Sequence, residues 1–317
     1  MTIVLKLKSL FALLILTSSF AAYSQPLTKV SLALNWKAEP EFGGFYTAAL
    51  LGIYKKHGLD VTILEGGSGT PTVQMLANGK VDYAIVSADE IIISQDRNAK
   101  NKVKGLFAVY QTSPYIVMTH VERNFKSLQE VLSSEGILSM QSGLPYYQFL
   151  VKKHGKPKVK VVPYTGGVAN FLNDKTFSQQ GFITTEPLSA EKGGAKVKTF
   201  LIADEGFNPY LVVLSATEDT LKNKPEVTKK LLLAIREGWQ AYLKDPVATN
   251  KHMVLLNKAF DLETFNKAAD IQKPLIEVKG TELGSMSKAR WETLSTQLKD
   301  LGLIKKIPAS VDLYSLL

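Results

Sequence analysis

The sequence predicts an α/β protein with two lobes, each a mainly parallel sheet flanked by helices, joined by a two-stranded hinge. From Thr28 onward, short β-rich runs alternate with helical runs, which is typical of right-handed βαβ units. This alternation stops near residues 111–113 and again near 206–210, and we expect the chain to cross between the lobes there. A chain of this length is also too large for one compact core.

The first block of the chain begins with the apolar–polar alternation of residues 30–34, which indicates a strand. The helix expected after it ends in two lysines and His57 before Gly58, a typical helix C-terminus. The block predicts strands at 30–34, 61–64, 83–86 and 103–110, with helices at 45–57, 70–77 and 89–95.

The second block repeats the alternation, and it is followed mainly by helices. It predicts strands at 115–118, 137–140, 158–162, 181–184 and 197–202, with helices at 127–134, 145–154, 167–174 and 186–192. After one more strand at 211–214, Pro225 starts an amphipathic helix that continues until Asp245-Pro246, and further helices are expected near 247–257, 262–273 and 286–301. Lobe 1 is therefore expected to contain residues 25–112 and 209–317, and lobe 2 residues 113–208.

Residues 1–24 are expected to be a cleaved secretory signal peptide. Two lysines precede an apolar run over 10–22, and Ala22-Tyr23-Ser24 places small residues at the −3 and −1 positions of the cleavage site. The apolar run is shorter than the roughly 20 residues that a membrane span requires, which disfavours a membrane anchor.

Composition excludes several kinds of partner and chemistry. The chain has no cysteine, so the sequence offers no disulfide, no thiolate metal site and no lipid-accepting cysteine. We expect an exported monomer that is free in the periplasm and is not inserted in a membrane. The net charge of +9 comes mainly from lysine. Because no stripe of arginines and aromatics accompanies this charge, we expect no nucleic-acid partner.

Ligands of open parallel sheets bind beyond the carboxyl ends of the strands, and five such loops are unusual here. The first is LNWKAEPEFGGFY, residues 34–46, which places Trp36, two carboxylates and Gly43-Gly44 before a helix. Glycines and free N–H groups at a helix start suit a ligand. The same residues also fit a tight turn with Trp36 and Phe42 in the core, and the residues alone leave these two alternatives equal.

The other four loops allow a similar choice. Residues 66–70 (GGSGT) and 87–89 (SAD) also fit a plain turn and a helix cap, which we favour there. In lobe 2, residues 141–143 with two nearby tyrosines, and the similar 164–167, place hydrogen-bonding groups and aromatics at helix starts. The last loop sets Glu186 before a proline that can open a helix, where an acidic residue is favoured in any case.

The sequence contains none of the common catalytic motifs. The four histidines show neither HxxxH nor HExxH spacing and are expected on the surface. There is also no G-x-S-x-G elbow and no recognisable pair of acid and base carboxylates. We therefore expect a binding protein and not an enzyme, with no catalytic residue, no metal site and no cofactor.

Several stretches together resemble one family. They are 34–36, 43–46, GIYKKHGLDV at 52–61, GKVDYA at 79–84, Glu186-Pro187, and the late helix with Gly238-Trp239 before Asp245-Pro246. Over about residues 28–257 the chain resembles the periplasmic solute-binding proteins of ABC importers that bind thiamine-pyrimidine precursors, within the nitrate/sulfonate/taurine class. The resemblance implies a type II periplasmic binding protein fold, in which a small ligand is held between two hinged lobes and delivered to a membrane permease driven by an ATPase.

The resemblance also implies roles for individual residues. Trp36 corresponds to the aromatic after the first strand, Tyr46 to a tyrosine of the first helix, and Glu186 to a glutamate that accepts hydrogen bonds from an aminopyrimidine. One departure is Lys37-Ala38-Glu39, where close thiamine-precursor binders tend to carry Pro-Asn-Thr. Riboflavin binders of the same group share the aromatic–glycine–aromatic passage. The predicted ligand-binding residues are Asn35, Trp36, Glu41, Phe42, Gly44, Tyr46, Ser68, Ser87, Tyr110, Gln141, Ser142, Tyr146, Tyr164, Gly166, Glu186 and Asn208.

Physical chemistry orders the candidate ligands. The many aromatic candidates suit a planar heteroaromatic ring, and a carboxylate at Glu186 repels a sulfonate or nitrate but accepts from an exocyclic amine. The expected order is an aminopyrimidine, then a flavin, then an organic oxyanion. Fungal thiamine-pyrimidine synthases also look related, but they depend on a cysteine-rich stretch and a histidine beside pyridoxal phosphate. A periplasmic lyase on the same fold and a receptor for a sensor kinase remain alternatives.

Overall fold

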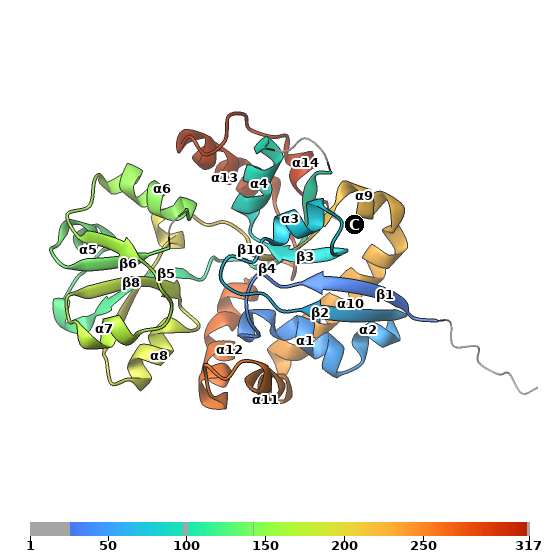
Figure 1. Cartoon of the computed structure of the whole chain (residues 1–317), viewed down its shortest axis with the longest axis horizontal. Helices are drawn as coiled ribbons and strands as arrows, with labels where there is room; N and C mark the ends of the chain where they lie inside the picture. Colours follow the sequence, from blue (N-terminus) through green and yellow to red (C-terminus); the bar gives the residue numbers. More distant parts are fainter. Residues whose placement is uncertain (1–25, 98–100, 142, 316–317) are drawn as a thin grey trace, which may run out of the picture.

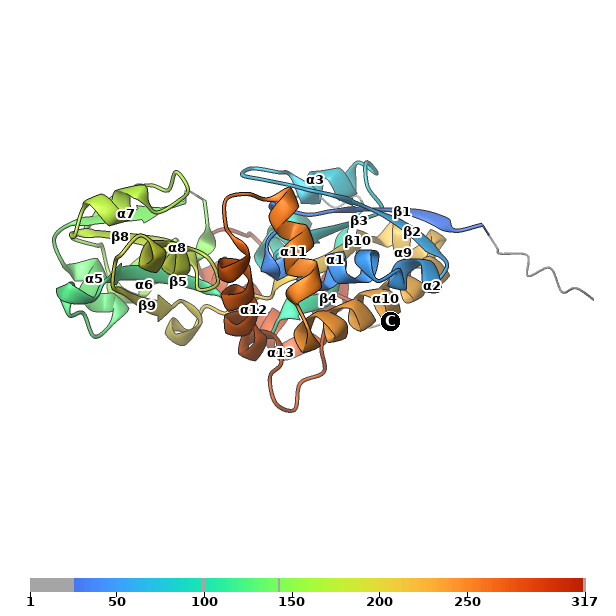
Figure 2. The same cartoon turned by 90° about the horizontal axis from the view of Figure 1, so that it is seen from below.

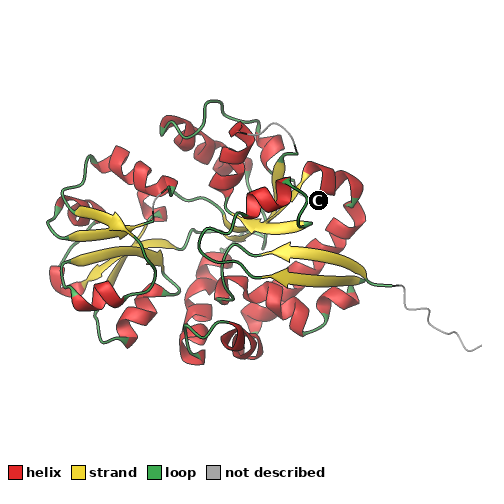
Figure 3. Cartoon of the chain, in the orientation of Figure 1, coloured by secondary structure: helices red, strands yellow, loops and turns green. Residues whose placement is uncertain are grey.

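The computed structural model describes residues 26–97, 101–141 and 143–315, and these fold into two lobes, each built on a five-stranded sheet (Figure 1). Lobe 1 has the strand order β2-β1-β3-β10-β4, and lobe 2 the order β7-β6-β8-β5-β9. Helices flank both sheets (Figure 3). The predicted α/β fold class is confirmed, whereas the predicted signal peptide lies outside the described residues.

Both sheets are mixed in the same way. In lobe 1, β10 runs antiparallel to β3 and β4, and the other four strands share one direction. In lobe 2, β5 is the antiparallel strand, between β8 and β9. Each antiparallel strand is the first one after the chain has crossed from the other lobe. The strands are β1 (Thr28–Ala33), β2 (Leu59–Leu64), β3 (Tyr83–Val86), β4 (Val103–Tyr110), β5 (Tyr115–His120), β6 (Ile137–Met140), β7 (Lys160–Pro163), β8 (Phe177–Phe182), β9 (Val197–Leu201) and β10 (Leu211–Thr217).

The helices follow the predicted order. Lobe 1 carries η1 (Pro40–Phe42), α1 (Gly43–Leu50), α2 (Ile53–Lys56), α3 (Thr72–Ala77), α4 (Ala88–Arg97), α9 (Glu218–Asn223), α10 (Pro225–Lys244), α11 (Val247–Leu256), α12 (Leu262–Ile276), α13 (Lys288–Asp300) and α14 (Ser310–Leu313). Lobe 2 carries η2 (Val121–Arg123), α5 (Leu128–Ser133), α6 (Pro145–His154), α7 (Ala169–Asn173), α8 (Glu186–Lys192) and η3 (Ala203–Glu205).

Two predicted elements are wrong in their bounds. The helix expected over 45–57 is divided into α1 and α2, because Gly52 between them adopts a left-handed conformation (φ +68°). The strand expected over 181–184 lies earlier in the chain, as β8. Thr184 and Thr185 therefore belong to a turn, and Glu186 is the first residue of α8.

Close helix packing in lobe 1 explains the double glycine of the opening segment. A Cβ atom at Gly43 would lie 2.2 Å from Tyr242 Cζ, and one at Gly44 would lie 2.2 Å from Trp239 Cγ. On the facing helix α10, a Cβ atom at Gly238 would lie 2.4 Å from the Gly44 carbonyl oxygen. The helices α1 and α10 therefore approach closely only because these positions lack side chains. Gly44 is therefore required for the packing of these helices, and its predicted ligand role stays a prediction.

The C-terminal helices hold the two crossings between the lobes. The Asn208 Oδ1, in the second crossing, accepts from the backbone N–H of Ser113 in the first (2.8 Å). Arg290 of α13 donates to the carbonyl oxygens of Gln111 (2.5 Å), Asn208 (2.7 Å) and Pro209 (3.0 Å), and to Asn208 Oδ1 (2.8 Å). One guanidinium group thus bonds both hinge segments. The side chain of Asn208 thus bonds within the hinge, and its predicted ligand role stays a prediction.

The lobes also meet away from the hinge. Helix α12 of lobe 1 lies against α8 of lobe 2 (Figure 2), and Lys192 of α8 forms an ion pair with Asp261, the N-cap residue of α12. Among the described residues, none of the helices has the length and apolar character needed to cross a membrane.

Candidate ligand site between the lobes

Strands β1 and β2 point toward lobe 2 (Figure 1), so the segment after β1 lies where the lobes face each other. Trp36 in this segment is half-buried, and its ring N–H donates to Glu39 Oε1 (3.0 Å). Asn257, from the end of α11, donates to the same oxygen (3.4 Å) and to the carbonyl of Ala38 (3.1 Å). The tryptophan ring is thus held in a fixed orientation with part of its surface free.

The start of α8 forms the facing wall in lobe 2. Glu186 Oε1 accepts from the Tyr164 hydroxyl (2.7 Å), and Glu186 Oε2 accepts from the Phe182 backbone N–H (2.7 Å) and the Thr185 hydroxyl (2.6 Å). The proline at the second position of the helix needs no N–H partner there, which suits a helix start. Three donors therefore fix the Glu186 carboxylate toward Tyr164 before any ligand binds.

Three carboxyl groups, two from lobe 1 and one from lobe 2, lie close enough for the charge of one to change the pKa of another. Glu39 is 6% exposed and Glu41 is 3% exposed. Burial, and then the negative charge of Glu186, raise the pKa of Glu41 to about 8. Burial, followed by the charges of Glu41 and Glu186, raises the pKa of Glu39 well above its usual value. Because like charges in a poorly hydrated site oppose ionisation, both lobe 1 carboxyls bind their protons more tightly than an exposed carboxyl does.

Tyr110 of β4 connects this group to the core of lobe 1. Its hydroxyl donates to Gln272 Oε1 (2.7 Å), and Gln272 in turn donates to the carbonyl of Pro40 (2.9 Å), next to Glu41. Burial and then the charge of Glu41 raise the pKa of Tyr110 well above its usual value, while the Thr184 hydroxyl of lobe 2 acts in the opposite direction. Tyr110, Glu41 and Thr184 therefore lie together where the lobes meet.

A second acidic group lies at the start of α4. Asp89 is buried, and its Oδ1 has no hydrogen-bond partner within the described part of the chain. Burial, followed by the charge of Glu90, raises the pKa of Asp89 to about 6. Burial and then the charge of Asp89 raise the pKa of Tyr115, at the hinge, well above its usual value. The Tyr115 ring packs on that of Tyr146 in lobe 2, with ring centroids 4.9 Å apart. Acidic and aromatic side chains thus meet here as well.

The other predicted site residues have different surroundings. Phe42 and Gly44 are buried in the core, the backbone N–H and the hydroxyl of Ser87 both donate to Glu90 Oε2 (2.9 Å each), and Tyr46 donates to Glu65 (3.2 Å). Ser68, Gln141 and Gly166 are exposed, whereas Asn35 is half-buried with an Oδ1 that finds no partner among the described residues. Ser142 lies outside the described residues.

Of the predicted site residues, the structure brings together Trp36, Glu41, Tyr110, Tyr146, Tyr164 and Glu186.

The expected surface position of the histidines is wrong for His120. Its side chain is fully buried, stacks on Phe171 with ring centroids 3.9 Å apart, and shares a hydrogen bond with the Phe171 carbonyl (2.8 Å). Within residues 26–97, 101–141 and 143–315, no cluster of three His, Cys, Asp or Glu side chains could hold a metal ion.

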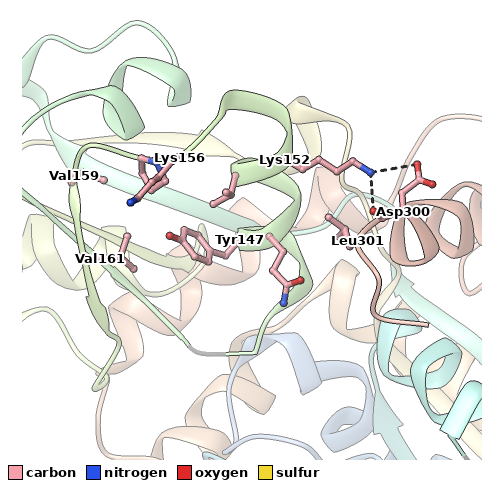
Figure 4. Close-up of a pocket in the computed structure, with 10 residues that line it drawn as sticks. Tyr147, Lys152, Lys156, Val159, Val161, Asp300 and Leu301 are labelled. Atoms are coloured by element: carbon pink, nitrogen blue, oxygen red, sulfur yellow. Dashed lines mark hydrogen bonds and ion pairs between the residues drawn. The ribbon is translucent and has the colours of Figure 1, made fainter. Parts of the chain in front are cut away.

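Two cavities lie apart from the carboxyl group. One of about 610 Å³ opens between α6 and β7 of lobe 2 and the end of α13 in lobe 1 (Figure 4). Lys152 reaches from α6 to Asp300 beside it and donates to the Asp300 carbonyl (2.8 Å). A smaller cavity of about 210 Å³ shares Tyr147 with the first and includes Gln141. Their described lining residues do not include Trp36, Glu41 or Glu186.

Sequence reasoning missed four side chains that lie where the lobes meet. Glu39 was noted as one of the two carboxylates of residues 34–46 and as a departure from a family pattern, but it was not assigned a ligand role, although its two-residue spacing from Glu41 around a proline was a visible signal. Thr184 and Asp89 lay in loops that the sequence had singled out, without being assigned a role. Gln272 carried no local signal, because its partners lie more than 150 residues earlier in the chain.

Comparison with known proteins identifies the fold and the family. The architecture is that of the periplasmic binding proteins: it superposes on the aliphatic sulphonate binding protein SsuA from Escherichia coli with a TM-score of 0.70, at 11% identity, over 90% of this chain and 91% of that chain. The profile of the family described as NMT1/THI5 like matches residues 39–249. The chain belongs to this family.

Relatives in sequence carry two kinds of name. The riboflavin-binding protein RibY from Chloroflexus aurantiacus is 23% identical over 260 residues, which cover 78% of this chain and 69% of that protein. A 4-amino-5-hydroxymethyl-2-methylpyrimidine phosphate synthase, THI11 from Saccharomyces cerevisiae, is 24% identical over 242 residues, which cover 71% of this chain and 70% of that one. Three further yeast relatives have the same enzyme name. The expectation that excluded an enzyme is therefore wrong, because the relatives of this chain include enzymes.

Proposed function

We propose that this protein is the solute-binding component of an ABC importer. It captures a small planar heteroaromatic solute between its lobes, an aminopyrimidine of the thiamine-precursor type, and delivers it to a permease driven by an ATPase. On this proposal the chain is exported and acts in the periplasm. The observation that carries the proposal is the interlobe group in which the half-exposed ring of Trp36 and the carboxyl groups of Glu41 and Glu186 come together.

The chemistry of this group favours a ring with hydrogen-bond donors on its edge. An aromatic face held in one orientation stacks on a flat ring at little entropic cost. A carboxyl oxygen accepts from an exocyclic amine but repels the oxygens of a sulfonate or nitrate. The likeness to sulphonate-binding proteins therefore supports the carrier architecture, while the acidic site argues against their ligand class.

A flavin is the second candidate for this site, because one relative is named as a riboflavin-binding protein. The isoalloxazine ring is planar, and its N–H donor suits a carboxyl acceptor. It is larger than a pyrimidine, so the two candidates differ in how far the lobes must separate.

A thermal-shift panel on the purified protein tests the proposal. The panel contains 4-amino-5-hydroxymethyl-2-methylpyrimidine, thiamine, riboflavin, taurine, an alkylsulfonate and nitrate. A ligand at 100 times its dissociation constant stabilises the folded state by about 2.7 kcal/mol, which gives a clear rise in melting temperature. A rise with the aminopyrimidine supports the proposal, a rise with riboflavin selects the second candidate, and a rise only with an oxyanion contradicts both.

Variants connect any binding to the proposed site. Trp36→Ala removes the stacking face and Glu186→Ala removes an acceptor, so each should weaken binding of the aminopyrimidine by about tenfold or more. Glu191→Gln changes an exposed carboxyl of the same helix α8 and serves as the matched control. Wild-type affinity in both site variants, with both folded, would show that the ligand binds elsewhere.

A further inference from the structure

The three carboxyl groups of the interlobe site differ in how far their oxygens are already bonded. Glu186 accepts from three donors. One carboxyl oxygen accepts from a hydroxyl, and the other accepts from a backbone N–H and a second hydroxyl. Glu39 Oε1 accepts from Trp36 and Asn257. Glu41 Oε2 is buried and has no hydrogen-bond partner among the residues that the structure describes. Glu41 therefore carries a buried acceptor that the described part of the chain leaves without a partner.

A second buried side chain at the same place is also unpartnered. Thr184 of lobe 2 is fully buried, and its hydroxyl has no hydrogen-bond partner within the described residues. It lies beside Tyr110, whose pKa is raised by burial and then by the nearby charge of Glu41. Buried polar atoms in native proteins are nearly always bonded. Two such atoms, one from each lobe and both close to Tyr110, point to a ligand that supplies the missing partner.

The charges around Glu41 define which ligand satisfies it. The titratable groups that face it are Glu39 on the same segment, Glu186 on α8, Tyr110 on β4 and Tyr242 on α10. All of them are neutral or negative, and no cation among the described residues pairs with these carboxyls in the ion pairs of the structure. A buried carboxylate without a counter-ion is costly, whereas one beside a cation is favourable.

We propose that Glu41 is the counter-ion for a positively charged nitrogen heterocycle, bound between Glu39 and Glu186. This rests on the proposed binding function and adds the charge class of the ligand and the residue that selects it. The cation enters beside the protonated Glu41 carboxyl, the O–H bond breaks, and the proton leaves to solvent, so that a heterocyclic cation and a carboxylate remain. Binding of a pre-formed cation thus releases one proton for each Glu41 that ionises.

Two small probes of nearly the same shape separate charge from shape. 4-Aminopyridine is protonated near neutral pH, whereas 4-aminopyrimidine is neutral there. Isothermal titration calorimetry of the wild-type protein should show the pyridinium ion binding about tenfold or more tightly than the pyrimidine. The apparent binding enthalpy of the cation should also vary with the ionisation enthalpy of the buffer, which reports the released proton.

Glu41→Gln keeps the shape of the side chain and removes its charge. In this variant the preference for the cation and the dependence on buffer should both be lost, while Glu191→Gln should retain them. Glu39→Gln should have the smaller effect, because Glu39 already has two donors. Circular dichroism confirms that each variant is folded.

The outcomes separate this inference from the proposed function. Equal binding of the two probes, binding of neither at millimolar concentration, or an unchanged preference in folded Glu41→Gln would each overturn the role of Glu41. Such a result would not contradict the proposed function, because a heterocycle of the thermal-shift panel could still bind. Conversely, charge-selective binding of the pyridinium ion stands even if the aminopyrimidine of the panel fails to bind.

Discussion

The replacement of Glu41 by glutamine tests the electrostatics of the interlobe site without any ligand. Glu41 is 3% exposed, and burial with the nearby charge of Glu186 raises its pKa from 4.5 to about 8. A carboxyl with a higher pKa in the folded chain binds its proton more tightly there than in the unfolded chain. Its favourable contribution is therefore complete below about pH 4.5 and is lost as the pH rises through about 8.

The magnitude follows from the two pKa values. Their difference corresponds to roughly 5 kcal/mol, at about 1.36 kcal/mol per pKa unit. This figure is a ceiling, because Glu39 shares the same site and the two carboxyls titrate as a coupled pair, so that the shift does not belong to Glu41 alone. Since Glu41→Gln stays neutral at every pH, we expect its free energy of unfolding to gain roughly 3 kcal/mol on the wild type between about pH 5 and 8.

Thermal unfolding followed by circular dichroism in steps across this pH range measures the effect. At about 2 °C per kcal/mol for a protein of this size, the difference in melting temperature should grow by about 6 °C. A constant cost of burying the glutamine amide shifts the whole curve and leaves this pH dependence intact. The exposed Glu191→Gln serves as control and should follow the wild type. Parallel curves for Glu41→Gln and the wild type would show that Glu41 is ionised throughout and would refute the reasoning.

Three further predictions concern the hinge and the packing of the lobes. Arg290→Lys keeps the charge but loses most of the hydrogen bonds to both hinge segments, so the free energy of unfolding should fall by about 2–3 kcal/mol. Amide hydrogen exchange at 111–113 and 208–210 should become faster. Unchanged exchange would show that Arg290 does not hold the two hinge segments. Gly44→Ala places a Cβ atom 2.2 Å from Trp239 Cγ and should lower the free energy of unfolding in urea by about 1–3 kcal/mol, whereas Gly67→Ala, with open space among the described residues, should change it by less than about 0.5 kcal/mol. Lys152→Ala breaks an exposed pair with Asp300 (3.8 Å) and should cost at most about 1 kcal/mol by the same assay; a larger loss would mean that this contact holds the lobes together.

The alternation of strands and helices could be predicted well because it depends on local periodicity. The predicted bounds of β3, β4, β6, α6 and α8 agree with the structure, and each of these segments has its own apolar pattern or its own end signal. Strand β8 was placed too late because its sequence, FSQQGF, contains two glutamines. Both are buried, and Gln180 Oε1 accepts from the Tyr146 hydroxyl (2.8 Å) while Gln179 donates to Gly167 (3.1 Å). Polar residues in a buried strand give no alternation, and their partners come from other elements.

The interpretation of the opening segment shows the same limit at single residues. The sequence indicated that residues 34–46 were unusual, but it left a ligand wall and a packed turn as equal alternatives. The structure assigns the two halves differently: Trp36, Glu39 and Glu41 face the interlobe site, whereas Gly43 and Gly44 receive the rings of α10. Which half serves which role depends on helices more than 190 residues later in the chain.

The sequence by itself determined the fold class, because the alternation of strands and helices follows from short-range patterns of apolar residues, glycines and helix caps. It also predicted the two crossings and the loops that could carry a site. Only the tertiary structure decided which of the candidate side chains meet and what charge they carry. A carboxyl such as Glu41 has the same local chemistry on a surface as in a core. Its protonation depends on the water removed by α10 and α12 and on the Glu186 carboxylate from the other lobe. These are properties of the folded arrangement and not of the segment.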